Sequence, residues 1–116
     1  MSPDPQAAPT PDLTPGPFRL AAAGSGPLRA EGPLTFASAR RARQLGLEAI
    51  AAASDGALLI DCQGISVSDS AGLAVLLDWL AAARAQQRSL RFVHLPQGLA
   101  ALGRISEVSE LLERGV

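Results

Sequence analysis

The chain has 116 residues, 47% hydrophobic, 18% charged and 3% aromatic, which suits one small domain with a modest core. Ten arginines, no lysine and eleven acidic residues give a formal charge of −1, so we expect no basic surface that would attract nucleic acid. A single cysteine, Cys62, and a single histidine, His94, exclude an internal disulfide and a zinc-finger scaffold.

No stretch of the sequence has the length of a membrane span, which needs about 20 predominantly apolar residues. The longest weakly charged stretch, residues 71–83, is shorter and contains Asp78. The first residues lack the basic start of a secretory signal. We therefore expect a cytoplasmic protein.

Prolines dominate the start of the chain, where six of the nine lie in residues 1–17. Proline fixes φ and removes a backbone donor, so this segment suits neither a helix nor a sheet. The sequence predicts a disordered leader over residues 1–17 and a single domain over residues 18–116.

Two short antiparallel strands are predicted next, around a turn at residues 24–27 that is rich in Gly and Pro. Apolar residues alternate from Phe18 to Ala22, and the second strand covers residues 28–34. Arg29 and Glu31 predict that one face of this strand meets water.

A helix is predicted after Thr35, whose hydroxyl can cap it, and it ends at Asp55-Gly56. Small and apolar residues recur along one helical face: Ala39, Ala42, Gly46, Ala49, Ile50 and Ala53. The opposite face carries Arg40, Arg41, Gln44 and Glu48, which we interpret as a solvated surface.

The apolar run at residues 57–60 predicts a central strand, and residues 64–68 are predicted to form a connecting loop. Asp69 can then cap a second helix. A strand at residues 90–95 and two short amphipathic segments, around Leu99 and Leu111, complete the pattern. Strands that alternate with helices indicate an α/β domain with parallel strands after an antiparallel start.

The second helix has one charge in residues 71–83, so it lacks the polar half of an ordinary surface helix. Its predicted core stripe consists of Leu73, Leu76, Leu77 and Leu80. Val75, Trp79 and Ala82 lie on another side and are surplus to that stripe. Two interpretations stay open: a partner protein covers this apolar flank, or a terminal segment of the chain folds over it.

Ser70 follows the capping Asp69 at a helix start, where free N–H groups and the helix dipole favour an anion. A phosphate on Ser70 would place about −1.5 to −2 charges beside the apolar flank and oppose docking there. Serine in a first helical turn is also common for conformational reasons alone.

Three stretches together resemble the STAS domain family. They are residues 32–36, residues 58–62, and the run Asp69-Ser70-Ala71-Gly72-Leu73 with the helix that follows it. The resemblance covers residues 18–112. It implies a STAS (SpoIIAA-like) α/β fold, with a mixed sheet of four to five strands, an antiparallel N-terminal hairpin, parallel strands and packed helices.

Within this family the helix and the Gly-Pro-Leu-Thr-Phe-Ala-Ser opening resemble the MlaB subunits of Mla phospholipid-transport ABC systems. That resemblance implies a noncatalytic adaptor, held at the inner membrane by its partner, which binds and supports an MlaF-like ATPase subunit. The implied contact residues are Asp69, Ser70, Ala71, Gly72, Val75 and Trp79. The alternative is an anti-sigma factor antagonist that an anti-sigma factor kinase switches by phosphorylating Ser70, and a small-ligand sensor is a third class.

An enzyme is not expected. His94 falls in a strand pattern. The chain has no lysine, so it cannot form a phosphate-binding loop that requires one. Nothing in the spacing of Asp69, Ser70 and His94 requires a catalytic triad. Cys62, at the end of a buried strand, is interpreted as a small core residue, and no metal or cofactor is expected.

Overall fold

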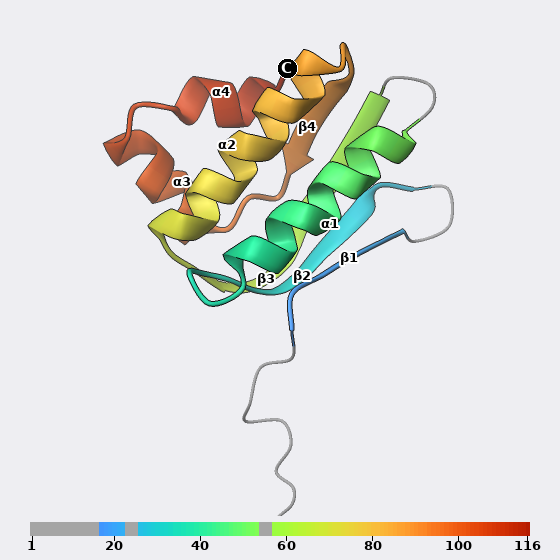
Figure 1. Cartoon of the computed structure of the whole chain (residues 1–116). Coiled ribbons are helices and arrows are strands. Elements are labelled where there is room, and N and C mark those ends of the chain that lie inside the picture. The colour runs from blue at the N-terminus through green and yellow to red at the C-terminus, as the bar shows by residue number, and fades with distance from the viewer. Residues whose placement is uncertain (1–16, 23–25, 54–56) are drawn as a thin grey trace, which may run out of the picture.

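The computed structural model describes residues 17–22, 26–53 and 57–116 (Figure 1). Most of the predicted leader, part of the predicted turn at residues 24–27 and the predicted helix end at Asp55-Gly56 lie outside these residues. The elements are β1 (Arg19–Ala22), β2 (Leu28–Leu34), α1 (Ala39–Ala52), β3 (Ala57–Ser68), α2 (Ser70–Ala85), β4 (Ser89–Val93), α3 (Gln97–Ile105) and α4 (Ser109–Arg114).

The four strands form one mixed sheet in the order β1-β2-β3-β4. The first pair is antiparallel, with Arg19 opposite Glu31, and the next two pairs are parallel. α1 connects β2 to β3 and α2 connects β3 to β4, as parallel neighbours require. The predicted α/β class, with an antiparallel start and parallel strands, is confirmed, and the described sheet has four strands.

β3 is longer than the sequence predicted. The expectation of a loop at residues 64–68 was wrong, because this segment continues β3 and pairs with the second half of β2. Ile65 is buried there, and a register shift between Arg29 and Glu31 accommodates the local irregularity. The strand therefore runs directly to Asp69, which fixes the position where α2 begins.

The start of α1 also differs from the prediction. Ser38, not Thr35, occupies the cap position, and its side chain makes no capping hydrogen bond to the helix. Its hydroxyl instead donates to the Pro33 carbonyl at 2.8 Å and accepts from the Thr35 N–H at 2.9 Å. Ser38 therefore braces the β2–α1 loop rather than the helix.

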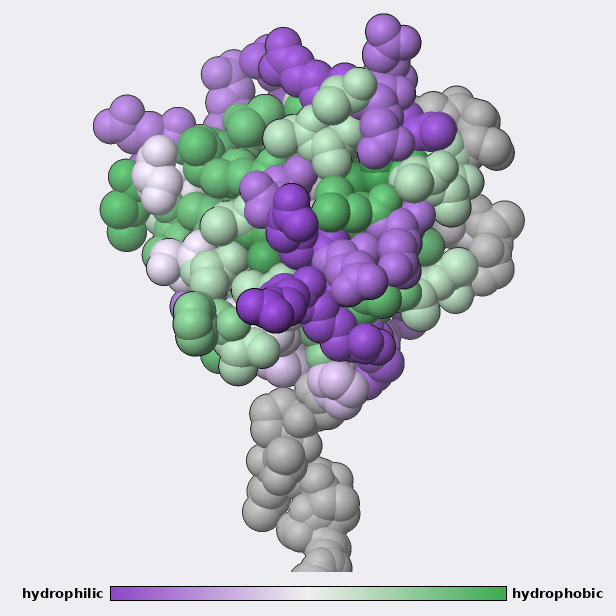
Figure 2. All heavy atoms as spheres, viewed as in Figure 1, coloured by the Kyte–Doolittle hydropathy of each residue, from purple (hydrophilic) through white to green (hydrophobic). Residues whose placement is uncertain are grey.

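The core lies on one face of the sheet, under α1 and α2, which cross that face side by side (Figure 1). Inward side chains of the strands, including Ile60, Cys62 and Phe92, pack against the buried sides of these helices. The predicted solvated face of α1 is exposed, and hydrophilic side chains gather over it in Figure 2. α1 and α2 therefore present their outer sides to solvent.

The last elements close the end of the sheet beside β4. α3 packs against α2, and α4 packs against β4. After α4, Gly115 adopts a φ of 74° and the Val116 N–H donates to the Leu90 carbonyl at 3.0 Å. Among the described residues, no helix is both long enough and apolar enough to cross a membrane.

Candidate functional site

The N-terminus of α2 forms an exposed corner that Asp69 organises. One carboxylate oxygen of Asp69, Oδ1, accepts the Gly72 N–H at 3.1 Å and caps α2, as predicted. The other oxygen, Oδ2, accepts the Phe36 N–H from the β2–α1 loop, also at 3.1 Å. One side chain thus ties the loop to the helix start.

These hydrogen bonds stabilise the charged form of Asp69. The bond from the Phe36 N–H is the largest cause that holds the pKa of Asp69 below its ordinary value of 3.8, and the Gly72 N–H acts in the same direction. Asp69 is therefore a carboxylate at neutral pH. Its charge is engaged by backbone donors rather than offered for acid–base chemistry.

Two neighbouring side chains at this corner face solvent. The Phe36 side chain is 84% exposed, the largest exposed fraction of any large hydrophobic residue that the structure describes. Ser70 is exposed as well, in the first turn of α2. We call Phe36, Asp69, Ser70 and Ala71 the Ser70 corner.

Gly72 sets how closely α2 approaches β2. A Cβ at this position would lie 2.1 Å from the Leu34 carbonyl oxygen, a contact that no side chain permits. Gly72 is itself buried, so its role is to let the helix start sit against the end of β2. It supports the corner without offering a surface to a partner.

A shallow groove of about 420 Å³ extends from the corner between the outer sides of α1 and α2. Small residues of both helices line it, including Ala39, Ala71 and Ala74. Arg43 Nε and Asp78 Oδ2 form an ion pair across it at 3.2 Å. We call this feature the α1–α2 groove.

The prediction that Val75 and Trp79 form an uncovered flank was wrong. Trp79 is 0% exposed and Val75 is 3% exposed, because α1 packs over this side of α2. The indole occupies the space that Gly46 leaves, and its Nε1 donates to the Arg43 carbonyl at 3.3 Å. Ala82 is half-buried. The cover is therefore α1, and not a partner protein or a terminal segment of the chain.

The aromatic contacts of Trp79 explain why it belongs to the core. Its ring centroid lies 6.2 Å from that of Phe18 and 6.4 Å from that of Phe92, so it joins α2 to the sheet. Of the six residues implied as partner contacts, Asp69, Ser70 and Ala71 therefore lie at the surface. Gly72, Val75 and Trp79 act from the interior.

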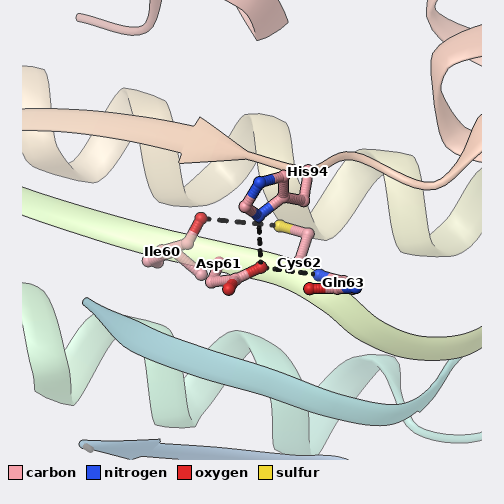
Figure 3. A network of polar contacts seen from close by, with 5 residues as sticks. All are labelled: Ile60, Asp61, Cys62, Gln63 and His94. Carbon is pink, nitrogen blue, oxygen red and sulfur yellow. Dashed lines mark hydrogen bonds and ion pairs between the residues drawn. The ribbon is translucent and has the colours of Figure 1, made fainter. Parts of the chain in front are cut away.

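His94 belongs to a separate polar cluster (Figure 3). It follows β4 with a φ of 56°, outside the strand in which it was predicted, and its Nδ1 lies 3.1 Å from Asp61 Oδ1. The hydrogen bond from the Gln63 N–H, followed by the contact with His94, lowers the pKa of Asp61. Asp61 lies within β3 and Ser70 begins α2, and the strand from Asp61 to Ser68 alone spans roughly 20 Å at about 3.3 Å per residue. His94 therefore does not join the Ser70 corner.

Cys62, next to Asp61, points into the core and is fully buried, as predicted. Burial raises the pKa of its thiol to about 12, with the Asp61 charge acting in the same direction. Within the described part of the chain, no three His, Cys, Asp or Glu residues gather as metal ligands.

A family model described as "Mlab, STAS domain" matches residues 19–113. The chain belongs to the STAS domain family. The match spans all eight elements of the STAS domain except the last residue of α4.

A solved structure shares the STAS fold, namely that of the anti-sigma factor antagonist SpoIIAA in its unphosphorylated form. The TM-score is 0.62 with 15% sequence identity, over 80% of this chain and 83% of that one. No curated protein matches this STAS domain in a sequence comparison. The structural likeness concerns the fold, since the identity is low.

Phe36 and Ala74 are surface residues of the site that the sequence did not single out. The charge of Asp78 could have indicated Ala74, because Ser70, Ala74 and Asp78 follow one another at four-residue spacing along one exposed side of α2. Phe36 lies in the Gly-Pro-Leu-Thr-Phe-Ala-Ser stretch that carried the resemblance, but no local pattern marked it as a surface residue. Its exposure depends on the loop that Ser38 and Asp69 hold.

Proposed function

We propose that this STAS domain is a noncatalytic adaptor that binds and supports the ATPase subunit of an Mla-type phospholipid-transport ABC complex. In this proposal the Ser70 corner and the α1–α2 groove form the contact surface, and the complex holds the domain at the inner membrane. The observation that carries the proposal is the Phe36 side chain, which is 84% exposed. The hydrogen bond from the Phe36 N–H to Asp69 holds this residue beside Ser70.

An exposed aromatic side chain on a braced loop suits protein docking. Large aromatic residues that become buried dominate the binding energy of many interfaces, and a loop that is already ordered loses little entropy on binding. The small residues along the groove allow a helix or loop of the partner to approach closely. The description of the matching family as "Mlab, STAS domain" supports an MlaF-like ATPase subunit as the partner.

The test is retention of a purified MlaF-like ATPase subunit on the immobilised STAS domain. We expect Phe36→Ala and Ser70→Asp each to weaken binding at least tenfold. The first removes the aromatic anchor, and the second adds a charge at the corner. Ile105→Ala is the matched control, because Ile105 is also apolar and 78% exposed but lies at the end of α3.

The control variant should bind the ATPase within twofold of the unaltered domain. Urea unfolding of all variants verifies that they remain folded. If Phe36→Ala and Ser70→Asp both bind as well as the unaltered domain, the proposed contact surface is wrong.

A second function, an antagonist that an anti-sigma factor kinase switches by phosphorylation, is supported by the exposure of Ser70 and the likeness to SpoIIAA. Incubation with a kinase-type anti-sigma factor and ATP, followed by intact-mass measurement, separates the two functions. One phosphate per chain that Ser70→Ala abolishes would favour the switch. An unmodified chain that retains the ATPase would favour the adaptor.

A further inference from the structure

We propose that a cavity at the other end of α2 binds a phosphate-type oxyanion. The cavity has a volume of about 710 Å³ and lies between the end of α2, the turn that follows, α4 and the last two residues. Three arginines line it: Arg84, Arg88 and Arg114. Hydrophilic side chains project from this end of the molecule in Figure 2.

The charge of the lining favours an anion. Glu110 is the single acidic side chain among the lining residues, and its Oε2 is paired with Arg114 Nη2 at 3.2 Å. Within the described part of the chain, Arg84 and Arg88 form no ion pair. Two guanidinium groups are thus available at one cavity of a protein whose formal charge is −1.

Arg88 supplies a second, independent observation. Its Nε is buried and has no hydrogen-bond partner among the residues that the structure describes. A buried donor without an acceptor costs free energy. An oxyanion that draws the guanidinium toward the cavity would supply the acceptor that the described residues do not provide.

These arginines are not needed to cap α2. The backbone N–H groups of Gln86, Gln87 and Arg88 already donate to the Ala82, Ala83 and Arg84 carbonyls. The usual structural explanation for basic residues at a helix end, binding to its free carbonyls, is therefore largely met by the turn itself. The guanidinium groups remain available for a ligand.

The wall of the cavity opposite α2 is fixed by backbone contacts. Gly115 takes a positive φ, and a Cβ there would lie 2.2 Å from the Leu90 carbonyl oxygen. Val116 is held on both sides, because its N–H donates to Leu90 and its oxygen accepts from Ser89 Oγ at 3.1 Å. This wall of the cavity is therefore in place before a ligand arrives, which favours binding.

The cavity is independent of the Ser70 corner. Ser70 and Arg84 are fourteen residues apart on α2, a distance of about 21 Å at 1.5 Å per residue. A ligand in the cavity and a protein on the corner can therefore be tested separately.

The test uses the full chain labelled with ¹⁵N, titrated with inorganic phosphate at constant ionic strength. We expect saturable shifts of the Arg88 Nε–Hε resonance, which chloride does not produce. Arg84→Gln/Arg114→Gln should weaken binding at least tenfold. The matched control, Arg40→Gln/Arg41→Gln, makes the same charge change on the exposed side of α1 and should bind within twofold.

A sedimentation assay with phosphatidylglycerol–phosphatidylcholine vesicles identifies the source of the phosphate group. Retention that the Arg84/Arg114 double variant loses supports a lipid headgroup. Phosphate binding without vesicle retention supports a soluble phosphorylated molecule. Equal weakening by both double variants, or no saturable response to phosphate or vesicles, would overturn the proposal.

Discussion

Asp69 joins two segments that lie 33 residues apart in the sequence, and its removal tests how much this link stabilises the domain. Asp69→Ala removes the helix cap and the bond to Phe36, and helix caps contribute about 1 kcal/mol. We therefore expect a loss of about 1–2 kcal/mol in the free energy of unfolding, measured by urea denaturation. Asp69→Asn, which can still cap, should lose less at pH 7.

The lowered pKa of Asp69 makes its contribution depend on pH. Because the folded pKa lies below the unfolded value of 3.8, the stabilisation is present above that value and is lost as the pH falls through the folded pKa. Urea midpoints measured from pH 6 down to pH 2.5 should therefore fall less for Asp69→Asn than for the unaltered domain. Parallel curves for the two proteins would contradict this assignment.

Phe36 should matter for binding and not for folding. Its side chain makes little contact with the core, so Phe36→Ala should change the free energy of unfolding by less than about 0.5 kcal/mol. Phe18→Ala, which truncates a buried aromatic ring, should cost about 3–5 kcal/mol in the same measurement. A large loss for Phe36→Ala would mean that the loop is part of the folded core.

At the scale of elements, the contact between α1 and α2 depends on the large side chain of Trp79 and on the lack of a side chain at Gly46. A Cβ at Gly46 would lie 2.0 Å from Trp79 Nε1. Gly46→Ala should therefore destabilise the domain by more than about 2 kcal/mol, as overpacking does. Trp79→Leu should also destabilise the domain by leaving a cavity, by less than the about 3–5 kcal/mol of a Trp→Ala change.

The double variant Gly46→Ala/Trp79→Leu distinguishes packing from other causes. Leucine lacks Nε1 and Cε2, the two atoms nearest to the new methyl group, so the two losses should not add. We expect a favourable coupling of about 1 kcal/mol or more in urea unfolding followed by circular dichroism. Strictly additive losses would show that α1 and α2 do not meet at this pair.

Most elements could be predicted because their local patterns agree with the fold. The bounds of β2 were predicted correctly, and α1, α2 and β4 differ from their predictions by a few residues at their ends. The extension of β3 over residues 64–68 was missed, since its polar and glycine residues suggest a loop. Pairing with β2, which no local pattern reveals, makes that segment a strand.

The site was predicted only where local chemistry defines it. Asp69 and Ser70 were placed correctly at the start of α2 because a helix cap has a sequence signature. Val75 and Trp79 were misplaced because one helical stripe was assumed to fill the core, whereas α2 is covered by both the sheet and α1. How many sides of a helix are covered is a property of the tertiary arrangement.

At the scale of the whole molecule, the buried hydrophobic residues of the described chain all lie between Phe18 and Leu112. We therefore expect a chain that begins at Pro17 to fold by itself. Its urea midpoint, followed by the fluorescence of the single tryptophan, Trp79, should match that of the full chain within error. A clearly lower midpoint would assign residues 1–16 a role in the fold.

The thiol of Cys62 is shut away in the middle of this core, and it is the sole sulfhydryl group of the chain. A thiol must ionise and become accessible before an alkylating reagent can react with it. Each native molecule is therefore labelled once, when an opening of the core exposes Cys62. The rate of modification therefore measures how often the core opens. Slower labelling when a partner or an anion is added would report bound ligand without any engineered probe.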